Sequence, residues 1–289
     1  MTPLKLSVII VNWNTRELLR ACLTSGLGAG TDSVEVIVVD NGSTDGSATM
    51  MEHDFPTSRL IRNTANLGFV AANNQGIAAS AGRYVLLLNS DTVVPVDAWA
   101  SLVAAAEARP RAGIIGPTLV NPDGSIQWSV RGFPTLLDHI ILFTKWHNFF
   151  PILLHRHLAV GFDYSREQVV DQVMGAAMLI RREVIDQIGG LDAAIWSWYE
   201  DVDYCARAKV AGWEVRYVPC TKIIHLKGQS FAQHLPLVKQ RMLVQSILIY
   251  TKKHQGPLAW LILWPFGMVS IALAFGVQLF GIKKINREL

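Results

Sequence analysis

The sequence predicts an α/β fold: a mainly parallel twisted sheet flanked by helices, with a membrane-associated helical segment at the C-terminal end. Over the first 120 residues, short β-branched runs alternate with amphipathic stretches, which is the pattern of strands joined by crossover helices. The chain has 289 residues, 51% of them hydrophobic, so it can bury a large core and is neither disordered nor collagen-like. A long apolar run near the C-terminus predicts the membrane-associated helical segment.

Local composition predicts each element. A strand is expected where apolar, β-branched residues run together, and the run at 84–88 is fully apolar, as in a strand buried on both faces. The helix at 97–108 is expected to end at Arg109, because Pro110 follows. The expected strands are 6–11, 34–39, 59–61, 84–88, 113–116, 172–180 and 214–218. The expected helices are 16–25, 46–52, 70–81, 97–108, 182–188, 201–211 and 235–252.

One segment in the middle of the chain fits neither pattern. Residues 121–124, Asn-Pro-Asp-Gly, predict a turn, as in a hairpin. The following stretch, 133–162, carries six aromatic residues and four histidines among apolar residues. A surface that touches lipid and ordinary buried packing both account for such a mixture, so the sequence leaves both interpretations open.

The apolar run covers 258–282, 25 residues without a charge. As one helix it would measure about 37 Å, against about 30 Å for the hydrocarbon core of a bilayer. Basic residues flank both ends, so charge does not decide an orientation. Pro265 and Gly267 are expected to break the helix if the run is a re-entrant hairpin, and a buried core helix is the alternative to membrane attachment. We therefore expect a catalytic domain at 1–233 and an amphipathic helix with a membrane segment at 234–289.

Composition also excludes several classes of partner. The 26 basic and 23 acidic residues leave a net charge of +3, which argues against a nucleic-acid partner. Cys22, Cys205 and Cys220 show no metal-ligand spacing, and their odd number suits a reducing compartment. The start of the chain lacks the cleavage site of a secretory signal. The glycine-rich run at 26–30 follows a helix and is interpreted as a helix end and loop, not a dinucleotide fingerprint.

Two acidic residues stand at strand ends, where ligands bind in open α/β sheets. Asp40 ends VIVVD and is able to accept the imide N–H of a uracil or thymine ring. Asp91 follows the apolar run LLLNS and is able to bind a divalent cation that bridges a diphosphate, because the phosphates and water complete the shell. Alternatively, each aspartate serves only its local turn.

A third group of acids begins a helix. Glu200, Asp201 and Asp203 lie within four residues, next to Trp198. Crowded carboxylates beside aromatic surface acquire a raised proton affinity, as a general base needs, although acids in a first helical turn also favour the helix dipole. His225 ends an apolar run and is either a metal ligand or a core histidine.

These motifs together resemble family 2 glycosyltransferases, in order and spacing, across residues 5–231. The bacterial rhamnosyltransferase-like branch is the most similar. The matching segments are SVIIVNWN, VIVVDNGSTDGS, RNTANLGF with Asn73, Asn74 and Gly76, LNSD, GAAMLIRR, GGLD, EDVD and HLKGQS.

The resemblance implies a GT-A fold and a role for each matching residue. Asp201 would be the general base, and Asp91 and His225 the ligands of a divalent metal, Mg²⁺ or Mn²⁺. The first acid of the family's metal motif is here Asn89, a neutral and weaker ligand. The residues implied to bind the nucleotide sugar are Val11, Asn12, Asp40, Asn66, Gly68, Asn73, Ser90 and Asp91. Those implied on the acceptor side are Gly175, Ala176, Trp198 and Glu200.

The function implied is inverting transfer of a sugar from a nucleotide-diphosphate donor. The branch favours dTDP-rhamnose as donor and a glycan or polyprenyl-linked acceptor, in bacterial surface polysaccharide synthesis at the cytoplasmic face of the inner membrane. A UDP-hexose donor is the alternative within the class, because Asp40 pairs with uracil as readily as with thymine. An inactive nucleotide-sugar-binding membrane scaffold and a nicotinamide oxidoreductase are the alternatives from other classes; the missing glycine fingerprint disfavours the second.

Overall fold

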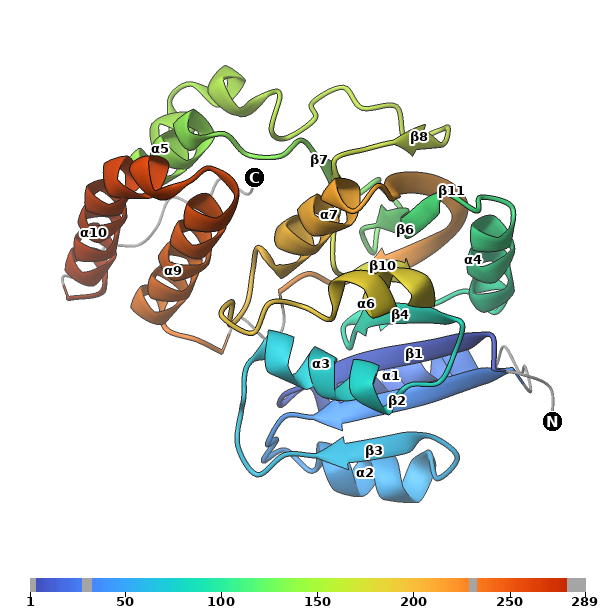
Figure 1. Cartoon of the computed structure of the whole chain (residues 1–289). Coiled ribbons are helices and arrows are strands. Elements are labelled where there is room, and N and C mark those ends of the chain that lie inside the picture. Colours follow the sequence, from blue (N-terminus) through green and yellow to red (C-terminus); the bar gives the residue numbers. More distant parts are fainter. Residues whose placement is uncertain (1–3, 28–32, 229–232, 280–289) are drawn as a thin grey trace.

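A mixed sheet runs through the centre of the computed structural model, which describes residues 4–27, 33–228 and 233–279. Its strand order is β3-β2-β1-β4-β10-β6-β11-β5, with β8 paired to β11 (Figure 1). The strands are β1 Leu6–Asn12, β2 Val34–Asp40, β3 Arg59–Arg62, β4 Tyr84–Asn89, β5 Thr92–Val93, β6 Ala112–Val120, β8 Gln168–Val169, β10 Ala177–Arg181 and β11 Glu214–His225. A separate pair joins β7 Val130–Arg131 to β9 Gln172–Val173.

Strands β1 to β4 pair in parallel, as expected, and β10 inserts antiparallel between β4 and β6. Helices cover both faces of the sheet (Figure 1). They are α1 Arg16–Leu27, α2 Ser47–Asp54, α3 Phe69–Ala79, α4 Ala98–Glu107, α6 Arg182–Ile188 and α7 Glu200–Val210. Beside the sheet, α5 Leu136–Thr144, α9 Pro236–His254 and α10 Pro257–Leu279 form a helical lobe (Figure 1). The expected order of strands and helices is therefore confirmed over most of the chain.

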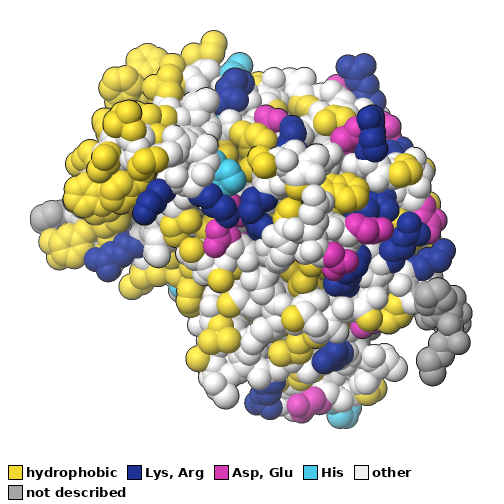
Figure 2. Space-filling model, in the orientation of Figure 1, with side chains coloured by type: hydrophobic (Ala, Val, Ile, Leu, Met, Phe, Trp, Pro, Cys, Tyr) yellow, Lys and Arg dark blue, Asp and Glu magenta, His cyan; other side chains and the backbone are white. Residues whose placement is uncertain are grey.

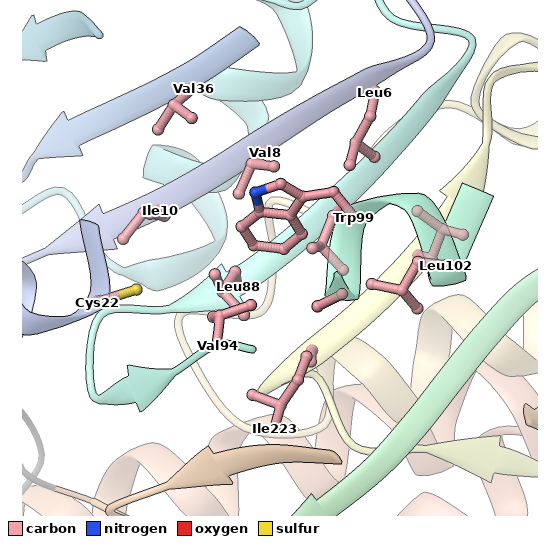
Figure 3. Close-up of a cluster of buried hydrophobic side chains, with 14 of the residues drawn as sticks. Leu6, Val8, Ile10, Cys22, Val36, Leu88, Val94, Trp99, Leu102 and Ile223 are labelled. Atoms are coloured by element: carbon pink, nitrogen blue, oxygen red, sulfur yellow. The ribbon is translucent and has the colours of Figure 1, made fainter. Parts of the chain in front are cut away.

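The core is divided by the sheet because side chains of a strand alternate between its faces. Leu6, Val8 and Ile10 of β1 point to the same side, where they meet Trp99 of α4 (Figure 3). Ile9 points to the other side, into a second cluster with residues of α3, α6 and α7. Burial on both faces explains why β1 reads as an unbroken apolar run.

Four expectations need correction. Residues 172–180 form two strands, because the chain leaves the sheet at 174–176 to contact α7. Strand β11 does not end at Val218 but continues to His225, and its pairing with β6 shifts register between Tyr217 and Lys222. The strand was expected to end before Pro219 because proline lacks the N–H that a strand needs for pairing. Residues 136–144 form helix α5, which starts with a capping box between Thr135 and Asp138. Pro265 lies inside α10, so the expected break does not occur. The turn at 121–124 is confirmed by the bond from Gly124 N to Asn121 O.

Helices α9 and α10 form an antiparallel hairpin that packs against α5 and α7. Leu263 of α10 is fully buried in a cluster with Phe143 of α5 and Val244 of α9. In the described part of the chain, α10 is the one helix that is long and apolar enough to cross a membrane, a criterion of length and composition alone.

A buried carboxylate connects this hairpin to α7. Asp203 is fully buried and accepts from Arg207 Nε, Lys253 Nζ and His254 Nε2, each at 2.8 Å. These hydrogen bonds and the Arg207 charge outweigh the effect of burial and hold the pKa of Asp203 at about 2. The end of α9 is thereby fixed to the middle of α7.

We expect Asp203→Asn to destabilise the protein by roughly 3 kcal/mol at pH 7, because three donors lose a buried charge. The ionised Asp203 contributes about 2.5 kcal/mol, given an unfolded pKa near 3.9. That contribution is complete above pH 4 and is lost as the pH falls through 2, so the difference between the wild type and the variant shrinks there. Denaturant unfolding at pH 7 and at low pH measures the free energy of unfolding of the wild type and the variant. Asp186→Asn, which alters an exposed carboxylate, is the matched control. Equal losses in the two variants would contradict the assignment.

Candidate functional site

A groove opens at the carboxyl ends of β1, β2 and β4, where the sequence placed the ligand. Its lining comes from the loops after these strands, the start of α3 and the segment before α7. The lining residues are Val11, Trp13, Asn41, Asn66, Phe69, Asn89, Ser90, Asp91, Trp196, Ser197, Gly228 and His234. We refer to it as the strand-end groove. Val11, Asn66, Ser90 and Asp91 were expected there; the other eight were not assigned to this role.

Asp40 lies behind the groove, almost completely buried at the end of β2. Its carboxylate accepts from Asn12 Nδ2 at 3.0 Å and from the Ser43 backbone at 3.2 Å. A carboxylate has further lone pairs, so these bonds leave acceptor capacity for a ligand N–H. Asn73 serves its own helix in this structure, where its amide donates to Phe69 O.

The loop before α3 is held by amide side chains. Asn41 Nδ2 donates to Asn66 Oδ1 at 2.9 Å and to Gly68 O at 3.2 Å, and Asn41 Oδ1 accepts from Leu67 N. Gly68 has φ +91°, and a Cβ there would lie 2.7 Å from the Trp196 ring. Glycine is required at this position, both for its conformation and for the close approach of Trp196.

Asp91 and His225 meet at the other end of the groove. His225 Nε2 lies 3.3 Å from Asp91 Oδ1 and 3.3 Å from Asn89 Nδ2, and both Asp91 and His225 are 5% exposed. The resemblance predicted this pairing of Asp91 with His225, which lie 134 positions apart, and the structure brings the two side chains together. β5 makes the contact possible, because Thr92 pairs with His225.

Gln127 fixes the orientation of the His225 ring. Its Nε2 donates to His225 O at 2.8 Å, so its Oε1 faces His225 Nδ1, at 2.9 Å, as an acceptor. Nδ1 therefore carries the proton, and the Nε2 lone pair accepts from Asn89 Nδ2 at 3.3 Å and lies 3.3 Å from Asp91 Oδ1. Two acceptors that face each other in a buried site suit a shared cation.

These residues fit a hard divalent cation that also binds a diphosphate. In the described ranges no group of three or more His, Cys, Asp or Glu side chains is placed to hold a metal by itself. Asp91 and His225 supply two ligands, and the Asn89 amide lies beside them. Two protein ligands suffice when phosphate oxygens and water complete the shell.

Asp201 approaches from the start of α7. Its Oδ2 accepts from Gly175 N at 2.9 Å, and its Oδ1 accepts from Val202 N at 2.8 Å. The neighbouring Ala176 O accepts from Asn89 N at 3.0 Å. Asp201 and the Asp91–His225 pair are thus connected through the turn 174–176.

The backbone before α7 is strained. Trp198 and Tyr199 have φ +60° and +65°, a left-handed conformation that costs free energy for residues with a side chain. The Tyr199 ring packs against His139 and Tyr250, which holds this conformation in place. It turns the chain so that Glu200 and Asp201 enter the first turn of α7.

Burial raises the proton affinity of both acids. It raises the pKa of Glu200 to about 8, with a further contribution from the Asp201 charge. Glu200 Oε2 has no hydrogen-bond partner. Burial also raises the pKa of Asp201, against the opposing effects of the Gly175 and Val202 N–H groups and of Arg131. Both carboxyl groups therefore hold a proton more tightly than a solvent-exposed carboxyl group does.

Comparison with known proteins decides the family. Residues 7–189 match the family described as glycosyl transferase family 2. The chain belongs to glycosyl transferase family 2. It is 31% identical over 277 residues, 88% of each chain, to the N-acetylglucosaminyl-diphospho-decaprenol L-rhamnosyltransferase of Mycobacterium tuberculosis. It is 26% identical to a rhamnosyltransferase of Escherichia coli, over 75% of this chain and 82% of the other.

As a family 2 glycosyltransferase of the rhamnosyltransferase-like branch, the protein also has the GT-A fold. The mannosyltransferase of Pyrobaculum calidifontis, solved with GDP-mannose and Mn²⁺, superimposes with a TM-score of 0.58 at 16% identity, over 99% of this chain and 79% of that one. Residues 156–229 also match the family described as the N-terminal domain of galactosyltransferase. This segment contains the turn 174–176 and the acids of α7.

We expect Gln127→Met to weaken binding of Mn²⁺ in the presence of dTDP by about 10- to 100-fold, because the His225 ring loses the acceptor that sets its tautomer. Calorimetric titration of the metal measures the effect. Gln172→Met removes another buried glutamine, one whose amide donates to Gly132 O, and should leave the affinity unchanged. Unaltered Mn²⁺ affinity in Gln127→Met would show that this residue does not orient a ligand.

Proposed function

We propose that the protein transfers L-rhamnose from dTDP-rhamnose, with inversion, to a polyprenyl-diphosphate-linked sugar at the cytoplasmic face of the inner membrane. The product would enter a bacterial surface polysaccharide. The observation that carries the proposal is the half-buried base candidate Asp201, which is connected through the turn 174–176 to the Asp91–His225 pair. The name of the Mycobacterium tuberculosis relative supports the donor sugar and the class of acceptor.

The donor would occupy the strand-end groove. Val11 and Asn66, which line the groove, would contact the nucleoside. Asp40 and Asn12, bonded to each other directly behind this lining, would receive the base, with Gly68 holding the adjacent loop. Ser90 and Asp91 would lie beside the diphosphate. Uracil offers the same imide N–H as thymine, so a UDP-hexose is the alternative donor.

A divalent cation, Mg²⁺ or Mn²⁺, would be held by Asp91 and His225. When bound, such an ion neutralises negative charge on a leaving diphosphate. The resident side chains prepare this site before any ion is present, since Gln127 already sets the His225 tautomer, with the lone pair on Nε2.

Asp201 would take the proton from an acceptor hydroxyl. As the proton moves to Asp201, the hydroxyl oxygen forms a bond to the anomeric carbon, and the bond from that carbon to the diphosphate oxygen breaks. Attack on the face opposite the leaving group inverts the anomeric centre. The raised pKa of Asp201 suits this role, because a base with a higher proton affinity accepts the proton more readily.

The acceptor would contact the turn 174–176 and the segment before α7. Gly175 packs directly against Asp201, since a Cβ there would lie 3.4 Å from Asp201 Cβ, and Trp198 would offer a flat surface to a sugar ring. Glu200, protonated near neutral pH because its pKa is raised to about 8, would donate rather than accept. Residues 1–233 would form the catalytic domain, and 234–289 would attach it to the membrane.

We expect Asp201→Asn to lower turnover by about 100- to 10,000-fold while leaving the affinity for dTDP-rhamnose unchanged, because the amide keeps the shape but not the basicity. Transfer of radiolabelled rhamnose to a short-chain prenyl-diphosphate acceptor measures turnover, and calorimetry measures donor affinity. EDTA should abolish wild-type transfer. Near-normal turnover in Asp201→Asn would show that another group is the base, and a wild type that neither transfers nor hydrolyses the donor would favour the inactive scaffold.

We expect Arg131→Met to move the acid limb of the kcat/KM profile to higher pH. The positive charge of Arg131 lowers the pKa of Asp201, so its removal raises that pKa, and the base is lost by protonation at a higher pH. Arg131→Lys keeps the charge and should keep the profile near that of the wild type. An acid limb in Arg131→Met at or below the wild-type position would contradict the assignment of this limb to Asp201.

A further inference from the structure

An exposed apolar face covers the lobe built from α5, α10 and the two short turns η1 (Trp146–Asn148) and η2 (Pro151–Leu154). Figure 2 shows hydrophobic side chains gathered over this lobe, with Lys and Arg at its border. On α10 the exposed members are Leu258, Leu261, Ile262, Trp264, Val269, Leu273, Phe275 and Leu279. The segment 146–153, which contains most of η1 and η2 and is called the second segment below, also has exposed apolar side chains. They are Trp146, Phe149, Phe150, Ile152 and Leu153. A contiguous patch of this size indicates an interaction surface.

The contacts of α10 fix it along the length of α9. Gln278 Oε1 accepts from Leu237 N near one end, and Gln240 Nε2 donates to Ser270 Oγ in a buried bond further along. A Cβ at Gly267 would lie 2.8 Å from Val244 Cγ1, so the two helices touch closely there. Leu263, Gly267 and Ser270 form the one buried stripe of α10, and its remaining surface is largely exposed.

This packing argues against α10 as a spanning helix. An α10 that crossed a bilayer would carry α9 with it, because the two helices run antiparallel in contact. The exposed side chains Arg241, Gln245 and Lys252 of α9 would then enter the hydrocarbon, where charged groups are costly. An α10 that lies in the interface avoids this cost, since its apolar side meets lipid and α9 stays on the aqueous side.

The second segment extends the same face. Phe149 and Ile152 are 77% and 70% exposed. The turns pack on α5 through Leu154 and Ile141, and α5 packs on α10 through Phe143, whose ring lies 3.4 Å from the Cβ position of Gly267. The exposed side chains of His155 and Arg156 follow directly in the chain, and the Arg156 guanidinium pairs with Asp138 at 2.6 Å. Aromatic side chains next to cations are typical of segments at the surface of an anionic membrane.

We propose that α10 lies in the plane of an anionic membrane surface and that residues 146–153 insert beside it as a second anchor. The protein would then dock on one leaflet without crossing it. This inference rests on the proposed membrane attachment and deepens it: it names a second anchor outside the C-terminal segment and the orientation of α10. Tyr199 packs in the cluster shared by α5, α9 and α10, so docking would place the strained turn before Asp201 close to the lipid.

The first test is flotation of the full chain with vesicles of phosphatidylethanolamine and phosphatidylglycerol. We expect the double variant F149S/I152S to reduce the partition coefficient by at least about tenfold, because two large apolar side chains no longer enter the lipid. V96S/V169S, which alters two exposed valines on other elements, should bind like the wild type. Neutral phosphatidylcholine vesicles should bind all forms more weakly. Partitioning of F149S/I152S equal to that of the wild type would overturn the second anchor. If light scattering also showed a changed oligomeric mass for this variant, the segment would be a contact between protein copies and not a lipid anchor.

The second test determines the orientation of α10. In a Cys220→Ser background, Lys252→Cys and Gln278→Cys place one thiol near each end of the helix. A membrane-impermeant maleimide added outside the vesicles should label both, because an in-plane helix keeps both ends on the side of entry. Labelling of Gln278→Cys only after detergent is added would overturn the in-plane orientation.

Failure of this inference is distinguishable from failure of the proposed function. Rhamnose transfer in detergent, with a short-chain acceptor, does not depend on vesicle docking, so F149S/I152S should retain wild-type turnover there. A wild type that binds vesicles but transfers no rhamnose would reject the proposed function and leave the docking geometry intact. Loss of detergent activity in F149S/I152S would instead assign the segment to the fold or the active site, and would overturn its role as a lipid anchor.

Discussion

The hydrogen bond from the Gly175 backbone to Asp201 fixes the start of α7 relative to the sheet. β10 begins two residues after Gly175 and pairs with β4, and Asp91 lies just beyond the end of β4. Asp201 therefore has a defined position relative to Asp91, because the path between them consists of backbone hydrogen bonds and a paired strand. An antiparallel β10 is what makes this possible, since it brings the turn 174–176 to the same edge of the sheet as the ends of the parallel strands.

The lobe formed by α5, α9 and α10 is also part of the scaffold that holds the site in shape. Two consecutive left-handed residues, Trp198 and Tyr199, cost roughly 1–3 kcal/mol each, and such a conformation persists only where the surroundings enforce it. Ser246 Oγ of α9 donates to Ser197 O at 2.8 Å, and Tyr250 of α9 packs on the Tyr199 ring. Helix α9 thus holds the turn that presents Glu200 and Asp201, so α9 contributes to the scaffold of the site.

The sequence predicted most of the local elements, and it failed where the tertiary structure decides. Strand ends and helix starts are local signals, so the positions of Asp40 at the end of β2, Asp91 after β4 and Asp201 at the start of α7 are as expected. Gln127 was missed because its role depends on His225, 98 positions away, and glutamine alone carries no signal for orienting an imidazole. The strand through Pro219 was cut short because a proline within a strand usually ends it, whereas here a register shift accommodates it. His234 was assigned to the membrane part, yet it lines the groove and stacks on Trp13 at 4.9 Å; nothing local to the sequence indicates such a return.

Helix α7 separates two kinds of acid by its geometry. Residues two positions apart in an α-helix point to nearly opposite sides, because each residue turns by about 100°. Asp201 therefore faces the turn 174–176, where burial raises its pKa, while Asp203 faces α9, where hydrogen bonds from three side chains lower its pKa. The same helix thus offers a carboxyl group with raised proton affinity to the site and a carboxylate with a pKa of about 2 to the lobe. Since Lys253 and His254 end α9 directly before α10 begins, the ionised side of α7 anchors the hairpin of α9 and α10, and the side with raised proton affinity faces the turn 174–176.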